Sequence, residues 1–249
     1  MAMNRASFAK TLEPGLNTLF GLEYDSYPAE YEAVFESNTS QKAFEEDVLL
    51  AGFGSAPTKN EGSAISYDDA GQQWTARYQH ETVALAFSIT EEAEEDGQYG
   101  SIASRYTKAL ARSMASTKEI KAANVLNNAT SVNIGDGTTL LSTSHPTQNG
   151  NQSNTLATAA DLSETSLEAI LIQIADMKDE RGLRIAAQGT QLVIPTAYTF
   201  VAERLLESQL RTGTADNDIN AIKSGGYLPK GYHVMRRLTD SDAFFVTTD

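Results

Sequence analysis

The sequence predicts an α+β fold organised around one long helix, and three observations lead to this class. Residues 99–128 contain no proline and are rich in Ala, Lys, Arg, Glu and Met, which favour helix. Residues 72–90 alternate polar and apolar side chains in the manner of a strand. Further along, short helix and strand patterns are interspersed without the strict strand–helix–strand repeat that a parallel sheet requires.

The N-terminal part shows no sustained hydrophobic period. Within residues 1–30, prolines and glycines such as Pro14 and Gly15 lie between aromatic residues, a pattern that favours an extended arm over a domain. Residues 31–51 carry a mixed pattern that fits short helix or short strand.

Residues 52–89 predict a long β-hairpin that turns near Asp68–Gly71. Its first arm is polar and rich in turn residues, whereas the second places Trp74, Ala76 and Tyr78 on one face. Because the first arm offers so few apolar side chains, we expect the hairpin to rest on a partner instead of burying its own core.

The long helix expected over residues 99–128 would span roughly 45 Å at ~1.5 Å per residue. An acidic run from Thr90 to Asp96 precedes it, and negative charge at this end favours a helix N-terminus through the macrodipole. Such a helix is longer than the average in globular proteins, and it predicts a structural strut.

The C-terminal part predicts two further helices, three strands and a loop. Ser163 offers N-cap chemistry for the first of these helices, and Pro195 ends the first strand. In chain order the elements are a helix over 163–178, a strand over 190–195, a helix over 196–206, a loop over 213–231, and strands over 232–238 and 242–248.

Composition excludes several classes of protein. The 33 acidic and 19 basic residues give a net charge of −14, which argues against tight nucleic-acid binding but suits a protein that lies near nucleic acid without holding it. Cysteine is absent, so disulfides, thiolate nucleophiles and cysteine-bound zinc are excluded. No apolar run approaches the ~20 residues of a membrane span, and the N-terminus lacks the apolar region of a secretory signal.

One stretch, "DGTTLLSTSHP" at residues 136–146, contains the elements of nucleophilic catalysis. Ser142 and Ser144 are potential nucleophiles, and His145 is a potential base. However, Ser144 and His145 are adjacent, so in a strand their side chains point to opposite faces, and no G-x-S-x-G motif occurs. We therefore expect His145 to hold its loop by bonding to backbone or to a neighbouring side chain.

Other candidate sites are no stronger. His80, His145 and His233 lack the spacing of a metal site, and the acidic loop 215–220 lacks the glycine and the final glutamate of a calcium loop. The glycine-containing loops at 52–57 and 224–231 lack the G-K-[ST] motif of a phosphate cradle, and the paired glutamates at 91–92 and 94–95 fit a charged helix start. We expect no catalytic, metal or cofactor-binding residues, and therefore no enzyme and no cofactor.

The order of the segments is more informative than any one site. The long helix is followed by "DGTTLLSTSHP", an asparagine–leucine pair at Asn154–Leu156, a helix, a strand that ends in proline, and "RRLTDSDAFFV" at residues 236–246. This order closely resembles the major capsid (head) proteins of tailed bacteriophages, notably the Mu-like group with the HK97-type fold. Upstream, residues 61–100 resemble the extended E-loop of that family, so that the resemblance covers residues 31–249.

The resemblance implies a domain organisation in which the arm and the E-loop lie over neighbouring subunits. The implied parts are an N-terminal arm at 1–30, an arm or P-domain segment at 31–51, the E-loop hairpin at 52–89, the spine helix of the P domain at 90–129, and the A domain with part of the P domain at 130–249. Some relatives link subunits through an E-loop lysine; Lys59 lies in that region, but no partner for it can be identified and it is not assigned as a site.

The resemblance also implies a function and partners. The expected protein assembles, in the cytoplasm of a bacterial host, as hexamers and pentamers of an icosahedral virion shell that encloses double-stranded DNA without reading its sequence. Scaffolding, portal and cement or decoration proteins are the implied partners, and no membrane is involved. Two alternatives stay open: the shell of an encapsulin-like nanocompartment, and, from another class, a hydrolase that uses Ser144 and His145.

Overall fold

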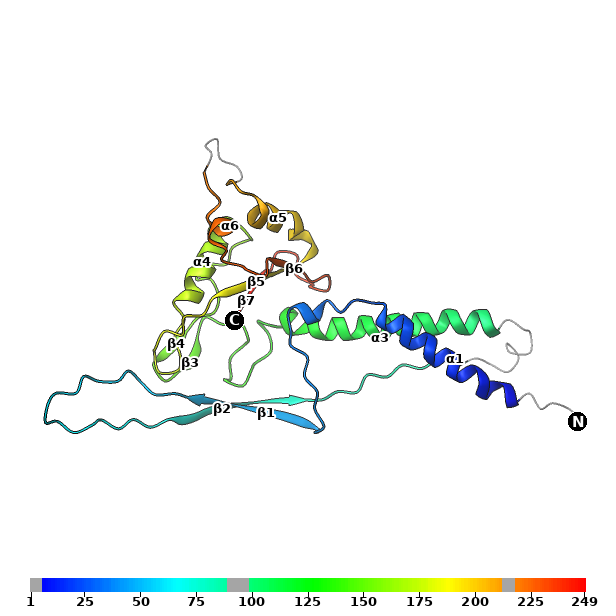
Figure 1. Ribbon diagram of the computed structural model, residues 1–249, viewed down its shortest axis with the longest axis horizontal. Coiled ribbons are helices and arrows are strands. Elements are labelled where there is room, and N and C mark those ends of the chain that lie inside the picture. Colours follow the sequence, from blue (N-terminus) through cyan, green and yellow to red (C-terminus); the bar gives the residue numbers. More distant parts are fainter. Residues whose placement is uncertain (1–5, 89–98, 212–217) are drawn as a thin grey trace, which may run out of the picture. The chain divides into compact units, whose positions relative to one another are not determined.

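The computed structural model describes residues 6–88, 99–211 and 218–249. It divides into two compact units, which are described separately (Figure 1). The first unit comprises Met1–Phe35 and Glu81–Ala123, and the second comprises Glu36–His80 and Asn124–Asp249.

The first unit is built from helices. Helix α1 covers Ala6–Asp25, the 3-10 helix η1 covers Tyr31–Ala33, and α3 covers Tyr99–Asn127, with its last turn in the second unit. The long helix is confirmed almost to the residue, but the extended arm is wrong because most of residues 1–30 are helical. Pro14 and Gly15 interrupt the hydrophobic pattern, whereas Phe20 and Tyr24 lie one turn apart and stack at 5.9 Å on the helix.

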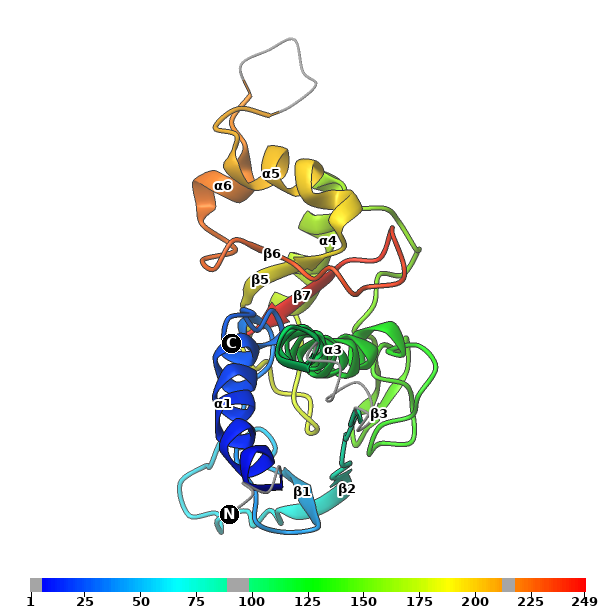
Figure 2. The same cartoon turned by 90° about the vertical axis from the view of Figure 1, so that its right-hand side faces the viewer.

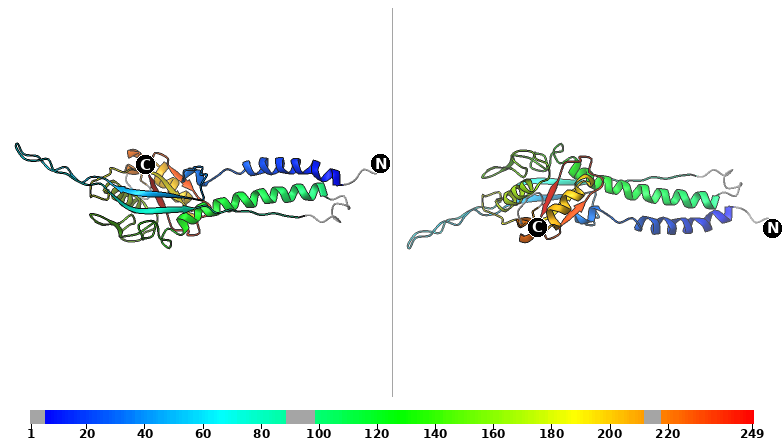
Figure 3. Two further views of the ribbon diagram at one scale, coloured as in Figure 1. Left: turned by 90° about the horizontal axis from the view of Figure 1, so that it is seen from below. Right: turned by 90° about the horizontal axis from the view of Figure 1, so that it is seen from above.

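The N-terminal segment lies along α3 (Figures 1 and 3). Positions 108, 112 and 119 of α3 share one face of the helix, and these three positions and position 118 contact the N-terminal segment. The contacts are Lys108 Nζ to Glu23 Oε2 at 3.7 Å, the Arg112 guanidinium over the Tyr27 ring at 5.8 Å, Lys118 Nζ over the buried Tyr31 ring at 4.8 Å, and the Glu30 N–H to Glu119 Oε1 at 2.8 Å.

In the second unit a two-stranded hairpin precedes the main fold. Strand β1 (Phe44–Ala51) pairs antiparallel with β2 (Gly71–Gln79), and residues 52–70 form the loop between them. The loop continues as a long ribbon beyond the paired strands (Figures 1 and 3).

The predicted hairpin is therefore wrong in its bounds, since its first strand lies upstream of residue 52 and the second ends at Gln79. Cross-strand contacts explain the observed pairing: Arg77 reaches Glu46 at 2.5 Å and stacks over the Phe44 ring at 4.5 Å. The alternating residues after Gln79 do not continue the strand, and Phe87 instead packs against Tyr106 of α3, with 5.9 Å between ring centroids.

The hydrophobic core of the second unit surrounds a three-stranded sheet in the order β6–β5–β7. Strand β5 (Gly189–Ile194) is central, parallel to β6 (Tyr232–Val234) and antiparallel to β7 (Phe245–Thr248). Leu192 and Ile194 of β5 are fully buried, and α4, α5 and α6 gather around the sheet (Figure 2). The remaining elements are α4 (Glu164–Ala175), η2 (Thr196–Tyr198), α5 (Thr199–Glu207), α6 (Ala221–Gly225) and the small hairpin of β3 (His145–Thr147) and β4 (Gly150–Gln152).

Capping explains where two of these helices begin. The predicted N-cap Ser163 is confirmed: its side chain accepts from the Ser166 N–H at 3.2 Å, and Ser166 bonds back to the Ser163 N–H at 2.9 Å. The short helix α6 lies where a loop was predicted. The buried Asn220 starts it by accepting from the Ile222 N–H at 3.1 Å, while its amide donates to the Leu205 carbonyl at 2.7 Å.

Among the described residues, no helix is both long enough and apolar enough to span a membrane.

Candidate functional site

The stretch that carried the sequence-based catalytic hypothesis begins with a tight turn. The Ile134 N–H donates to the Thr138 carbonyl at 2.7 Å, and the Gly137 N–H donates to the Ile134 carbonyl at 3.0 Å. Gly137 has a φ of +83°, a left-handed conformation that glycine adopts without steric cost. The turn directs the Asp136 carboxylate back toward Thr138, whose N–H donates to it at 2.9 Å.

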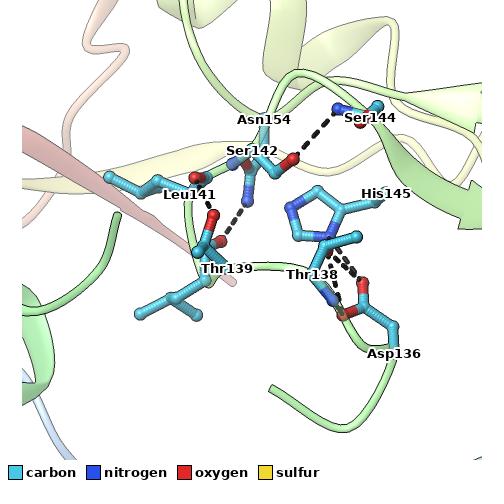
Figure 4. A network of polar contacts seen from close by, with 9 residues as sticks. Asp136, Thr138, Thr139, Leu141, Ser142, Ser144, His145 and Asn154 are labelled. Carbon is cyan, nitrogen blue, oxygen red and sulfur yellow. Dashed lines mark hydrogen bonds and ion pairs between the residues drawn. The ribbon is translucent and has the colours of Figure 1, made fainter. Parts of the chain in front are cut away.

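Asp136, Thr138 and His145 form a compact network (Figure 4). His145 Nδ1 lies 2.6 Å from Asp136 Oδ2 and 3.0 Å from Thr138 Oγ1, and the Thr138 hydroxyl lies 3.0 Å from both carboxylate oxygens. The Asp136 side chain is 4% exposed and that of His145 is 17% exposed. The prediction that His145 ties down its loop is confirmed, because its partners are neighbouring side chains of the same stretch.

The two serines are placed differently from a catalytic nucleophile. Ser142 Oγ accepts the Ser144 N–H at 3.1 Å, and the Ser142 N–H donates to the Asn154 side chain at 2.9 Å. His145 Nε2 is buried and has no hydrogen-bond partner among the described residues. The pairing of a serine hydroxyl with this imidazole, which the hydrolase alternative requires, is therefore missing from the described contacts.

The hydrogen bonds of Asn154 show what this asparagine contributes after residues 136–146. Its amide donates to the Leu140 carbonyl at 2.8 Å and accepts from the Ser142 N–H at 2.9 Å, while its own N–H donates to the Ser142 carbonyl at 3.1 Å. A single side chain thus satisfies backbone groups on both sides of Leu141. Asn154 thus holds the irregular segment through hydrogen bonds to its backbone, as a neighbouring strand would.

The remaining candidates lie apart from this network. His80 follows β2, and His233 lies in β6 opposite Val193. No group of three His, Cys, Asp or Glu side chains suited to a metal ion occurs within residues 6–88, 99–211 and 218–249. The glutamates at 91–92 and 94–95, the acidic run from Thr90 to Asp96 and the first half of the loop at 215–220 lie outside the described residues.

Sequence reasoning missed two features of the second unit. It did not assign Asp136 as the partner of His145, although an Asp-Gly pair followed by threonine is typical of a turn closed by the aspartate side chain. It also did not foresee that Trp74 of β2 packs on Gly135, where a Cβ would lie 2.7 Å from Trp74 Cζ3. This second contact pairs residues far apart in sequence, and no local pattern indicates it.

The loop between β1 and β2 exposes apolar side chains. Tyr67 is 93% exposed, Ile65 68% and Phe53 61%, and Leu50 at the end of β1 is 73% exposed. Clustered apolar exposure on an extended segment is typical of a surface that another protein covers. Lys59 lies on the same exposed loop.

The hydrogen bonds among Asp136, Thr138 and His145 predict that the stability of the fold depends on pH. Burial acts to raise the pKa of Asp136, but the hydrogen bonds from His145 and Thr138 outweigh it and lower the pKa below its ordinary value of 3.8. A carboxyl group with a lowered folded-state pKa stabilises the fold above its unfolded pKa, and this stabilisation is lost as pH falls through the lower folded value.

We therefore expect Asp136→Asn to be less stable than the wild type at pH 6, and the gap to shrink as pH is lowered toward 3. Urea unfolding at several pH values measures this, with Asp69→Asn, an exposed carboxylate on the hairpin loop, as the control. A gap that is constant over this range would contradict the assignment.

Comparisons with known proteins now give the family. A family model described as phage capsid protein matches residues 73–249, which is more than half of the chain. The fold is similar to that of the bacteriophage JBD30 capsid, with a TM-score of 0.62 and 14% identity over 84% of this chain and 89% of that one. It is also similar to the JBD30 capsid decorated with minor capsid protein trimers, with a TM-score of 0.63 and 14% identity over 86% and 92% of the two chains.

A third similar structure is the procapsid of JBD30, with a TM-score of 0.59 and 14% identity over 94% of this chain and 99% of that one. A search of curated protein sequences found no match. At 14% identity the structural similarity shows the fold, and the family match shows the relationship. The chain belongs to the phage capsid protein family, and it is a structural shell protein of a bacteriophage.

Proposed function

We propose that this chain is the major head subunit of a tailed bacteriophage, of the HK97-type fold and the Mu-like group, and that it acts without catalysis. It assembles as hexamers and pentamers of an icosahedral shell around double-stranded DNA, after synthesis in the host cytoplasm. The observation that carries the proposal is the loop between β1 and β2, a long ribbon whose apolar side chains Phe53, Ile65 and Tyr67 are exposed in the single subunit.

The domain assignments follow from the same proposal. Residues 1–30 are the N-terminal arm, 31–51 continue toward the P domain, 52–89 are the E-loop, 90–129 are the spine region, and 130–249 are the A domain with part of the P domain. The exposed side chains of the ribbon favour the E-loop assignment, because apolar groups left in water are costly unless another chain covers them.

Charge supports a shell that encloses DNA without holding it. With a net charge of −14, the subunit lacks the excess of Lys and Arg that neutralises phosphates in nucleic-acid binding proteins. Portal and scaffolding proteins are further proposed partners. One of the similar JBD30 structures is decorated with minor capsid protein trimers, and we propose that a decoration protein binds this shell as well.

Electron microscopy of the purified protein tests the proposal. We expect closed shells of tens to hundreds of subunits. A clean monomer with esterase activity that His145→Ala abolishes would overturn the proposal in favour of a hydrolase. Particle diameter and a packaged genome in shells from infected cells separate a phage head from a nanocompartment.

A further inference from the structure

Residues 179–183 form a tight turn after α4, and this turn fixes the backbone at Arg181. Asp179 Oδ1 accepts from the Arg181 N–H at 2.9 Å and from the Leu183 N–H at 2.7 Å, and the Asp179 N–H donates to the Leu183 carbonyl at 2.7 Å. Gly182 has a φ of +88°, and a Cβ there would lie 2.9 Å from Asn149 Cγ. Only glycine fits this position without strain, so the turn packs tightly against the β3–β4 hairpin.

The β3–β4 hairpin is joined to the same turn a second time. The Gln152 amide donates to the Lys178 carbonyl at 2.9 Å and accepts from the Lys178 N–H at 3.1 Å. The Arg181 side chain then crosses to Gln148, with 2.9 Å between Nη1 and Oε1. The contact with Gln148 thus helps to orient the guanidinium group of Arg181 toward the loop between β1 and β2.

From this base Arg181 reaches the loop between β1 and β2. Arg181 Nη2 lies 2.5 Å from Asp68 Oδ1, and the Arg181 side chain is 25% exposed. The other carboxylate oxygen of Asp68 accepts the Gly54 N–H at 2.7 Å. One carboxylate therefore joins the outgoing and returning arms of the loop to each other and to the body of the second unit.

The charge of Asp68 is favoured by this arrangement. The Gly54 N–H and then the Arg181 guanidinium lower the pKa of Asp68, so the group is ionised at neutral pH. A charge-assisted hydrogen bond is stronger than a neutral one, yet the Asp68 side chain is 43% exposed. Solvent and salt screen a pair of this kind, so we expect the contact to weaken as the salt concentration rises.

We propose that Arg181 and Asp68 form a latch that sets the direction of residues 52–70 in the unassembled subunit and keeps this direction when that loop engages a second copy of the chain. The first half of the proposal concerns the single subunit, and the second half rests on the proposed shell function. The latch orients the loop before contact, so that less conformational freedom is lost on association.

A distance measurement between two spin labels tests the first half. The chain contains no cysteine, so Ser63→Cys in the loop and Glu203→Cys in α5 introduce its only two thiols. In the unassembled subunit we expect one main distance peak. Arg181→Gln should increase the fraction of molecules outside that peak about threefold, and 0.5 M salt should move the wild type in the same direction.

Two further variants sharpen this test. Asp68→Asn retains an oxygen for the Gly54 N–H but removes the charge, and it should reproduce the effect of Arg181→Gln. Arg184→Gln is the matched control, because Arg184 lies in the same segment and pairs with Asp176 at 2.6 Å instead of with the loop. Distance distributions that stay narrow in both latch variants, or that broaden equally in the control, would overturn the latch.

Assembly kinetics test the second half. Light scattering should show that Arg181→Gln forms shells about threefold more slowly than the wild type and Arg184→Gln. If the distances respond as expected and the wild type forms no shells, the latch stands and the proposed function fails. If shells form at an unchanged rate in Arg181→Gln, the link between latch and assembly is overturned.

Discussion

Replacing residues 52–70 with an Asn-Gly turn is expected to leave a folded subunit that no longer forms shells. Strand pairing ends at Ala51 and Gly71, and a two-residue Asn-Gly turn connects antiparallel strands directly. The buried core cluster lies between Leu162 and Leu228, so the deletion removes none of it. The deleted loop carries the exposed side chains that we assign to contacts between subunits.

The yield of shells should fall about 100-fold, which is the size of effect expected when the central residues of an interface are lost. Electron microscopy and gel filtration measure assembly, and urea unfolding measures the stability of the subunit. A Gly/Ser loop of the original length is the control that separates loop length from side chains, and it should also fail to assemble. Normal shells from the Asn-Gly variant would refute the E-loop assignment.

Gly135→Ala is expected to destabilise the second unit by about 1–3 kcal/mol, as overpacking does. A Cβ at Gly135 would lie 2.7 Å from Trp74 Cζ3 and 3.2 Å from the Cα of Ala76. The nearest atoms belong to a rigid ring and to backbone, so the strand β2 must move away from the turn that carries Asp136.

Trp74 is the only tryptophan, and its fluorescence therefore reports on this contact without a label. We expect a red-shifted emission and a lower urea midpoint for Gly135→Ala. Gly52→Ala is the matched control, because nothing lies within 4 Å of a Cβ at that position, and its midpoint should stay close to that of the wild type. Equal midpoints for the two variants would show that β2 is not packed on Gly135 in solution.

The helices were the part of the fold most accessible from sequence. The long helix was expected over residues 99–128 and covers Tyr99–Asn127, because helix propensity and the absence of proline are local properties that persist in the fold. Ser163 was likewise recognisable as an N-cap, since the capping box spans only four residues. Helix α1 was not predicted, because Pro14 and Gly15 interrupt its hydrophobic pattern. Its contact with α3, from Glu23 to Lys108, nonetheless supports the helix.

The hairpin shows where local reasoning fails. Alternation placed Trp74, Ala76 and Tyr78 on one face of β2, where Trp74 and Ala76 are half-buried but Tyr78 is exposed. It could not choose the partner strand. That choice depends on cross-strand contacts such as Arg77 with Glu46 and Phe44, whose members lie some thirty positions apart. Strand pairing is a nonlocal property, and single-sequence patterns do not contain it.

For the candidate site, sequence alone predicted that His145 holds its own loop, because adjacent serine and histidine side chains diverge in a strand and are poorly placed to act together in catalysis. Tertiary structure decided what His145 holds: the Asp136 carboxylate, which the turn at Gly137 directs toward it, and Thr138 beside it. Tertiary structure also decided that Arg181 meets Asp68 and that Trp74 covers Gly135. Residue type and spacing set local conformation, whereas contacts between distant segments follow from the packing of the whole unit.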